Sequence, residues 1–230
     1  MATKNGASYL REQLDSIMLQ LSSEDELIIS DDHSTDSTAA IIQTYNDPRI
    51  RIIENFQTLG ISKNFEAALT ASKNPFIFLA DQDDVWKENK VAVMMNYLRD
   101  HDLVISDCLI ADHCLNPKND SFFRLNNSGK GLIKNVLKNS YMGCCMAFNR
   151  KVLNQALPFP KDIPVHDHWI GLIGEFHFDV RFIPEVLVYH RRHANNASTT
   201  GSSSNQKLSA QFSNRYRILK HLFLRKSYAS

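Results

Sequence analysis

The chain has 230 residues, and its 26 Lys and Arg residues nearly balance its 25 Asp and Glu residues, which leaves a net charge of +1. A charge this small excludes a global electrostatic field that would hold a nucleic acid. With 43% hydrophobic and 22% charged residues, the composition excludes disordered and fibrous proteins. We expect one globular α/β body with at most a small annex.

Targeting signals and membrane spans are not evident in the sequence. No apolar run approaches the roughly 20 residues that a membrane-spanning helix needs, and no charged-then-apolar leader opens the chain. The four cysteines include the vicinal pair Cys144 and Cys145 but no CxxC motif, which is a poor basis for disulfides or a zinc site. We therefore expect a soluble cytoplasmic protein with reduced thiols.

Helical and strand-like patterns alternate through the first part of the chain, and this alternation predicts a mostly parallel sheet with helices on both faces. Apolar residues recur at spacings of three and four in the expected helices, and short apolar runs mark the expected strands. The expected helices cover 10–21, 37–45, 61–69 and the region around 94–98, and the expected strands cover 26–30, 50–53 and 76–80.

The pattern becomes less regular after about residue 110, so we assign residues 1–110 to a nucleotide-binding part and 111–193 to an acceptor part of one domain. Within the second part we expect a polar loop at 116–127, short helices at 133–137 and 169–173, and strands at 144–148, 180–183 and 186–189. Residues 194–206 are rich in Ala, Asn, Ser, Thr and Gly, which predicts a flexible loop.

The last segment, 207–230, combines six Lys and Arg residues with apolar residues at helical spacing and contains no acid. Two interpretations stay open for this basic amphipathic segment. It could rest on an anionic membrane surface, as basic amphipathic helices do, or its apolar side could pack on the domain.

Two clusters of carboxylates directly follow expected strands. Asp31 and Asp32 follow the string ELIIS, and Asp81, Asp83 and Asp84 follow the string FIFLA. In open α/β sheets ligands bind beyond the carboxyl ends of the strands, so both clusters are candidate sites. Like charges this close raise one another's pKa unless a cation or hydrogen-bond donors compensate them. We expect such compensation at both places.

The Asp-x-Asp pair formed by Asp81 and Asp83 suits a hard cation that takes its other ligands from phosphate oxygens and water, which describes Mg²⁺ or Mn²⁺ with a diphosphate. The sequence contains neither a G-x-G-x-x-G fingerprint nor a P-loop motif. A nucleotide-linked substrate held through a metal ion is therefore the favoured interpretation.

Seven strings of the sequence, in order, resemble a known family. They are ATKNGASYLREQLDSI, IISDDHSTDST, GISKNFEAAL, FIFLADQDDVW, MGCCMAFNR, HDHW and RRHANNAS. The chain resembles a family 2 glycosyltransferase of the rhamnosyltransferase-like branch, with the GT-A (Rossmann-like) fold, from residue 1 to about residue 200. The resemblance implies inverting, metal-dependent transfer of a sugar from a nucleoside diphosphate to an acceptor hydroxyl.

The resemblance also implies roles for residues at the nucleoside end of the donor. Thr3 and Asn5 would lie at the base and ribose, Asp32 would bind the nucleoside, and Asp31 would support Asp32. Asn64, in the string GISKNF, would lie near the nucleotide.

Further roles follow at the reacting end. Asp81 would contact the donor, Asp83 would be the metal ligand, and His193 would reach the metal or the diphosphate. Asp167 matches the position of the general base, which inversion requires on the face opposite the leaving group.

Three more residues are candidates for contact with substrate. The guanidinium of Arg191 could neutralise the departing diphosphate. Trp169 could stack on a sugar face, although burial in the core is the simpler interpretation for a tryptophan. Gly143 could permit close approach of a substrate, or it could be an ordinary strand-entry glycine.

Two features depart from the family pattern. Met1 falls where the first strand of the family should be ending, so we expect that strand to be absent, which would leave neighbouring backbone groups unpaired. Lys4 replaces an aromatic residue of the first string.

Two alternatives stay open. Asp81, Asp83 and Val85 also fit the D-x-D-x-V motif of a haloacid-dehalogenase-like phosphatase, and a non-catalytic remnant could still bind a nucleotide. Donor and acceptor identity are not encoded in these motifs. We name dTDP-rhamnose as a possible donor and a saccharide or lipid-linked acceptor in cell-surface polysaccharide synthesis, with possible peripheral contact at the inner face of the membrane.

Overall fold

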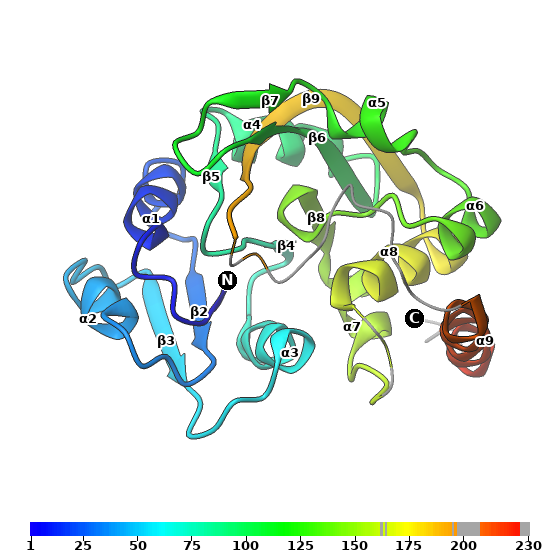
Figure 1. Cartoon of the computed structure of the whole chain (residues 1–230), viewed down its shortest axis with the longest axis horizontal. Coiled ribbons are helices and arrows are strands. Elements are labelled where there is room, and N and C mark those ends of the chain that lie inside the picture. The colour runs from blue at the N-terminus through cyan, green and yellow to red at the C-terminus, as the bar shows by residue number, and fades with distance from the viewer. Residues whose placement is uncertain (162, 164, 195, 197–207, 226–230) are drawn as a thin grey trace.

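The computed structural model describes residues 1–161, 163, 165–194, 196 and 208–225, which form an α/β fold (Figure 1). The strands are β1 (Ala2–Thr3), β2 (Leu27–Asp31), β3 (Ile50–Glu54), β4 (Phe76–Phe78), β5 (Val85–Trp86), β6 (Leu103–Ala111), β7 (Pro117–Asn119), β8 (Met146–Asn149) and β9 (Val180–Arg191). The α-helices are α1 (Leu10–Met18), α2 (Thr38–Gln43), α3 (Ile61–Ala71), α4 (Lys90–Tyr97), α5 (Phe122–Asn126), α6 (Leu132–Leu137), α7 (Arg150–Ala156), α8 (His166–His177) and α9 (Leu208–Leu224), and a 3₁₀ turn, η1, covers Gly143–Cys145.

The first sheet consists of β1, β2 and β3, which all run parallel. Helices α1 and α2 lie on one side of these strands and α3 lies on the other (Figure 1). All five residues of β2 are buried, because a strand covered on both faces exposes neither set of side chains. This layout places the ends of β1 and β2, with the polar residues that follow them, at the same edge of the sheet.

The second sheet has the order β4-β8-β6-β9-β5, and β7 pairs with the edge of β6. Only β6 and β9 pair in parallel here, whereas β4–β8, β6–β8, β5–β9 and β6–β7 are antiparallel. The α/β class and the helices on both faces are confirmed, but the expectation of a mostly parallel sheet is correct only for the first three strands. A single parallel bridge from Ala2 to Asp81 connects the two sheets.

Several local expectations for the second half of the chain were wrong. The expected polar loop at 116–127 contains β7 and α5, and the two expected strands at 180–183 and 186–189 are one strand, β9, with register shifts. Asp107 explains part of this result, because its Oδ1 accepts a hydrogen bond from the backbone N–H of Phe123 and its Oδ2 accepts one from Ser121. A carboxylate inside the buried strand β6 thus anchors the first turn of α5.

The expected absence of a first strand was also wrong in part. Ala2 and Thr3 form the short strand β1, which lies opposite Ser30 and Asp31 of β2. Met1 is buried, and its terminal ammonium donates to the backbone oxygen of Ile28 at 2.7 Å.

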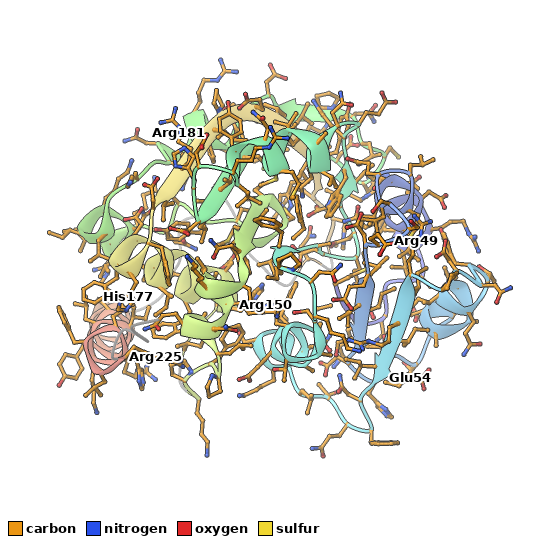
Figure 2. All side chains as sticks on the ribbon, turned by 180° about the vertical axis from the view of Figure 1, so that it is seen from behind. Arg49, Glu54, Arg150, His177, Arg181 and Arg225 are labelled. Atoms are coloured by element: carbon orange, nitrogen blue, oxygen red, sulfur yellow. The ribbon has the colours of Figure 1, made fainter. Side chains whose placement is uncertain are left out.

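Helices α7 and α9 each connect segments that are distant in the sequence. Arg150, at the start of α7, donates to the backbone oxygens of Ser72 and Asn74 at 3.1 Å each, which ties α7 to the segment between α3 and β4 (Figure 2). Helix α9 confirms the expected amphipathic segment and contacts α6 and α8, with Ile218 and Leu222 buried. The interpretation of 207–230 as a segment packed on the domain therefore holds for this face of α9.

The remaining expectations for the C-terminal part concern residues that are only partly described. Of the expected flexible loop at 194–206, the structure describes only residues 194 and 196, and the rest lies outside the described residues. Among the helices of the described residues, none combines the length and apolarity that crossing a membrane requires.

Candidate active site

Asp31, at the end of β2, is buried and fully engaged by donors of this chain. Its Oδ1 accepts hydrogen bonds from the hydroxyls of Thr3 at 2.8 Å and Ser34 at 2.6 Å, and its Oδ2 accepts one from the N–H of Ser34 at 2.8 Å. Asn5 adds a second tie, because its Oδ1 accepts from the N–H of Thr35 at 2.8 Å. Thr3, Asn5 and Asp31 thus build the turn after β2.

Asp32 and Asn64 are equally occupied. The Asp32 carboxylate accepts from the N–H groups of Leu59 at 2.6 Å and Gly60 at 3.1 Å, and the ammonium of Lys4 lies 3.7 Å away. Asn64, in the first turn of α3, donates to the backbone oxygen of Thr3 at 3.1 Å. The compensation that we expected for the first acidic cluster therefore comes from the chain itself, and these residues connect β1, β2 and the start of α3.

Gln82, between the two aspartates of the Asp-x-Asp pair, connects this region to the second cluster. Its amide accepts from the N–H of Lys4 at 2.8 Å and donates to the oxygen of Lys4 at 3.0 Å. A Cβ on Gly6 would lie 2.2 Å from Oε1 of Gln82, so any larger residue there would displace the Gln82 amide from Lys4.

The second acidic cluster combines three carboxylates with different surroundings. Burial and the charges of Asp84 and Asp83 raise the pKa of Asp81 well above its ordinary value, and the nearby charge of Asp167 adds to this rise. Burial and the charge of Asp84 also raise the pKa of Asp83. Within the described residues, no hydrogen-bond donor is assigned to the Asp81 carboxylate. In this cluster, unlike the first, burial and mutual repulsion disfavour the charged forms of Asp81 and Asp83.

Asp84 is fully buried and belongs to an ion pair beneath the cluster. Its Oδ1 lies 2.9 Å from Nδ1 of His190 and accepts from the N–H of Arg191 at 3.0 Å. Burial alone would lower the pKa of His190, but the Asp84 carboxylate raises it to about 9, so the imidazole is protonated at neutral pH. Asp84 therefore anchors β9 to the loop after β4.

The segment after β9 orients Asp83. Its Oδ2 lies 2.9 Å from Nε2 of His193, and Nδ2 of Asn196 donates to the same oxygen at 2.9 Å. The ring of His193 stacks on Tyr9 with centroids 4.6 Å apart. His193 is therefore placed beside the candidate metal ligand, as predicted.

Arg191 is in a different position from the one we expected. Its side chain is buried, its Nε donates to the backbone oxygen of Asp83 at 2.8 Å, and Nη1 donates to the oxygen of His113 at 2.6 Å. Nη2 donates to the carboxylate of Glu12. With its donors engaged by three separate segments, Arg191 fixes the loop of the Asp-x-Asp pair and does not face a diphosphate directly.

Asp167 lies in the first turn of α8, with its carboxylate held by two backbone amides. Its Oδ1 accepts from the N–H of His168 at 2.5 Å and its Oδ2 from the N–H of Gly143 at 3.0 Å. Burial raises the pKa of Asp167 to about 6, although these hydrogen bonds oppose the rise. Cys144, next to Gly143, has its Sγ 4.0 Å from Nδ1 of His190, so the segment that holds Asp167 packs beside the ion pair beneath the second acidic cluster.

Gly143 and Trp169 have structural roles. A Cβ on Gly143 would lie 3.3 Å from Nε2 of His166 and 3.5 Å from Cβ of Asp167, so this glycine allows the close contact that holds the base. The expectation that Trp169 stacks on a sugar is wrong. Its indole is 1% exposed and donates to the backbone oxygen of Ala156 at 2.9 Å, because α7 and α9 enclose it.

The residues present fit a divalent metal ion at the second cluster. Asp81 and Asp83 offer hard oxygen ligands, and burial with neighbouring carboxylates raises the pKa values of both groups, an effect that a bound cation would oppose. A second group, Asp84, Cys144 and His190, has ligand atoms within 4.8 Å of one another. That group fits a metal poorly, because the charged His190 already pairs with Asp84.

Comparison with known proteins agrees with this geometry. The fold matches that of S. aureus TarS residues 1–349 in complex with UDP-GlcNAc, with a TM-score of 0.72, 17% identity, and coverage of 96% of this chain and 63% of that chain. It also matches the mannosyltransferase PcManGT from Pyrobaculum calidifontis in complex with GDP-Man and Mn²⁺, with a TM-score of 0.62, 18% identity, and coverage of 97% and 68%. The chain thus has the GT-A fold of glycosyltransferases.

The family model for "Glycosyl transferase family 2" matches residues 1–157, and the chain belongs to this family. One relative is the Escherichia coli UDP-Glc:alpha-D-GlcNAc-diphosphoundecaprenol beta-1,3-glucosyltransferase WfgD, 23% identical over 168 residues. The match covers 70% of this chain and 62% of the relative, so the chain spans less than two thirds of the relative's length. The family assignment excludes the phosphatase alternative.

Some contributors to the site were not found by sequence reasoning. Gln82 carries no charge and occupies the unspecified middle position of the Asp-x-Asp pair. Tyr9 lies in a stretch whose pattern predicts only the start of a helix. Lys90, fully buried, donates to the backbone oxygen of Cys144 and lies 4.0 Å above the ring of Trp86. For Asn196, which donates to Asp83, the available sequence signal was its place in the string RRHANNAS.

Proposed function

We propose that this chain transfers a sugar from a nucleoside-diphosphate donor to an acceptor hydroxyl with inversion, in a reaction that depends on Mg²⁺ or Mn²⁺. The observation that carries the proposal is that the segment holding the Asp167 carboxylate, Gly143 and Cys144, packs against His190, the buried partner of Asp84 in the second acidic cluster. Inversion by direct displacement needs a base on one side of the sugar and charge neutralisation on the other. This arrangement provides candidates for both.

Asp167 is the proposed general base. Its pKa of about 6 leaves the carboxylate ionised at neutral pH yet more basic than an ordinary aspartate. The amides of Gly143 and His168 fix both carboxylate oxygens, so the group is oriented before an acceptor arrives.

Asp83 is the proposed metal ligand, with Asp81 beside it at the donor. When bound, the metal ion supplies Lewis-acid neutralisation of the charge that grows on the diphosphate. His193 and Asn196 both contact one oxygen of Asp83, which fixes the orientation of this carboxylate. The complex of PcManGT with GDP-Man and Mn²⁺ supports a nucleotide-sugar donor bound together with a divalent metal ion here.

The nucleoside is proposed to lie against the wall formed by Thr3, Asn5, Asp31, Asp32 and Asn64. Each of these residues lies at the ends of β1 and β2 or the start of α3, where open α/β sheets bind ligands. Their side chains are engaged by this chain, so we infer that they act mainly by holding the wall in shape.

The donor sugar and the acceptor are proposed by analogy. We infer a donor such as dTDP-rhamnose and an acceptor in cell-surface polysaccharide synthesis. The name of WfgD contains a lipid-linked saccharide acceptor, which supports a saccharide on a lipid carrier as the acceptor here. Helix α9 exposes Tyr216, Lys220, Phe223 and Leu224, which could rest on the inner face of the membrane. This placement would locate the enzyme in the cytoplasm at the membrane surface.

Turnover of a panel of sugar nucleotides with Mn²⁺ or Mg²⁺ tests the proposal. The wild-type chain and the Asp167→Asn variant would be assayed for donor hydrolysis and for transfer to simple saccharide acceptors, followed by NMR of the anomeric configuration. We expect metal-dependent turnover of one donor class with inverted product. Nucleotide binding without turnover of any donor would favour a non-catalytic remnant, and a product with retained configuration would contradict the role of Asp167.

A further inference from the structure

Charge is distributed unevenly along the chain. Residues 1–110 contain 9 Lys and Arg against 18 Asp and Glu, whereas residues 111–230 contain 17 against 7. Within the second part, residues 121–161 carry seven Lys and Arg and no acid, and residues 208–225, the described part of the C-terminal segment, carry four and no acid. The near-zero net charge thus hides an acidic half and a basic half, and this asymmetry favours an anionic partner for the basic half.

Exposed large apolar side chains gather on the same basic segments. Among the described residues, eight such side chains are more than half exposed, and six of the eight lie on α5, α6 and α9. These six are Leu125, Ile133, Leu137, Tyr216, Phe223 and Leu224. Helices α6 and α9 contact each other on the side of the molecule opposite α2 and β3 (Figure 1). We call their combined outer surface the α6–α9 face.

Helix α6 is held on α8 in a fixed orientation. The side chain of Asn135 donates to Oε1 of Glu175 at 3.0 Å, and the N–H of Gly131 donates to the same oxygen at 2.9 Å. These contacts bury Asn135, whereas Ile133 and Leu137, four residues apart, share the outer side of α6 with exposures of 77% and 56%. A helix that is apolar on its outer side as well as toward the core needs a second apolar environment.

Helix α9 continues this surface. Nη2 of Arg215 donates to the backbone oxygen of Leu137 at 2.8 Å, which joins α9 to the C-terminal end of α6. Ile218 and Leu222 are buried toward the domain, whereas Phe223 is 70% exposed. The two helices therefore present one continuous surface that contains both cations and large apolar side chains.

Lysines surround the exposed apolar residues of α6. Lys130, Lys134 and Lys138 lie on this helix or directly beside it. Nζ of Lys138 donates to the backbone oxygen of Asn126 at 2.7 Å, and Lys130 pairs with the exposed Asp179 at 3.1 Å. Such surface contacts contribute little and are readily exchanged for others. Ammonium groups beside exposed aliphatic side chains suit the boundary of a bilayer, where lipid phosphates lie next to hydrocarbon.

We propose that the α6–α9 face docks on an anionic lipid bilayer, with Ile133, Leu137 and Phe223 entering the headgroup boundary and the lysines of α6 meeting lipid phosphates. This inference builds on the membrane contact of α9 in the proposed function and goes beyond it, because it makes α6 an equal part of the contact. Charge complementarity selects the bilayer over other occupants. A second copy on a twofold axis would place like cations together, and a nucleic acid would leave the aliphatic side chains in water.

Docking in this way would orient the candidate active site. Asp167 lies in the first turn of α8, and both α6 and α9 pack on this same helix. The bilayer would therefore lie on the acceptor part of the chain, and the nucleoside end would point away from it. A lipid-linked acceptor is anchored in the surface that this arrangement brings to the acceptor part.

Sedimentation with vesicles tests the docking face and requires no enzymatic turnover. The chain is mixed with vesicles of phosphatidylcholine alone and with vesicles in which about a third of the lipid is phosphatidylglycerol. We expect binding to the anionic vesicles at least about tenfold tighter than to the neutral ones, and weaker binding when the salt concentration is raised. Equal binding to both kinds of vesicle, binding to neither, or tighter binding to a nucleic-acid duplex would overturn the inference.

Replacement of the apolar residues of α6 tests their entry into the bilayer. The double variant Ile133→Asp with Leu137→Asp should weaken binding to anionic vesicles at least about tenfold. Leu19→Asp with Phe56→Asp, at exposed apolar residues outside the face, is the matched control and should bind as the wild type does. Analytical ultracentrifugation without lipid should show a monomer. A dimer that the α6 variant dissociates would assign the face to a second copy and overturn the inference.

Charge reversal on α6 tests the contact with lipid phosphates. Lys134→Glu with Lys138→Glu should weaken binding about tenfold, whereas Lys73→Glu with Arg99→Glu, an equal change of net charge at exposed positions of the first half, should weaken it about twofold or less. If both α6 variants bind as the wild type does while Phe223→Asp does not bind, α9 alone carries the contact and the inference is wrong. Vesicle binding without turnover of any donor would instead refute the proposed function and leave the docking face in place.

Discussion

The pH dependence of transfer should report the ionisation of Asp167. A base must be unprotonated to accept the proton of the acceptor, and burial raises the pKa of Asp167 to about 6. Activity should therefore fall as the pH drops through 6 and should be constant above about pH 7. With this pKa, about a tenth of the molecules carry the ionised base at pH 5 and about nine tenths at pH 7, which predicts a roughly tenfold change in kcat/KM.

The Asp167→Asn variant separates this titration from those of Asp81 and Asp83, whose pKa values are also raised. Loss of the base should lower kcat by about 10² to 10⁴-fold, equivalent to about 3 to 5 kcal/mol, and should remove the pH dependence from the residual rate. Asp120→Asn, at an exposed carboxylate, is the matched control and should behave as the wild type.

Steady-state rates from pH 5 to 8 at saturating Mn²⁺ provide the measurement. A wild-type kcat/KM that stays level between pH 5 and 7 would refute the assignment of the base. A full pH dependence retained by Asp167→Asn would assign the titration to the metal ligands instead.

Three further substitutions address the residues around the site. Trp169→Ala should cost about 3 to 5 kcal/mol and lower Tm by roughly 10 °C, because the indole is buried; an unchanged Tm with a raised substrate KM would restore the sugar-stacking role. Gly6→Ala should displace the Gln82 amide and so lower Tm about as much as Gln82→Ala does, and the double variant should lose no more than either; additive losses would contradict this contact. Arg191→Lys should weaken apparent Mn²⁺ affinity about tenfold in activity titrations, because a lysine cannot replace the guanidinium that holds Asp83, and unchanged affinity would rule that out.

The features that sequence predicts well are those set by neighbours in the chain. The alternation of helices and strands through β4 follows from local apolar spacing, and the carboxylates after β2 and β4 lie at strand ends because they directly follow the strands. The assignment of Asp83 and Asp167 to one site comes from the resemblance to the family, because the 84 positions that separate them in the sequence carry no local sign of a shared role.

The features that sequence did not predict depend on distant partners. The ion pair of Asp84 with His190 joins groups 106 residues apart, and nothing local marks either residue as a structural anchor. Asp107 interrupts the apolar pattern of β6, which makes this strand hard to predict from the sequence. Its carboxylate finds hydrogen-bond donors in the later segment that begins α5. For Trp169 the sequence favours a core position, and the packing of α7 and α9 on α8 settles it.

Calorimetric titration with a nucleoside diphosphate, with and without Mn²⁺, tests the central claim most directly. The account predicts that the wild type and Asp120→Ala bind the nucleotide tightly only with the metal, and that Asp83→Ala loses the metal-dependent part of the affinity, at least about tenfold. Binding that is equally tight without a divalent ion, or an Asp83→Ala variant that binds the metal and nucleotide as the wild type does, would contradict a metal-held diphosphate at this site.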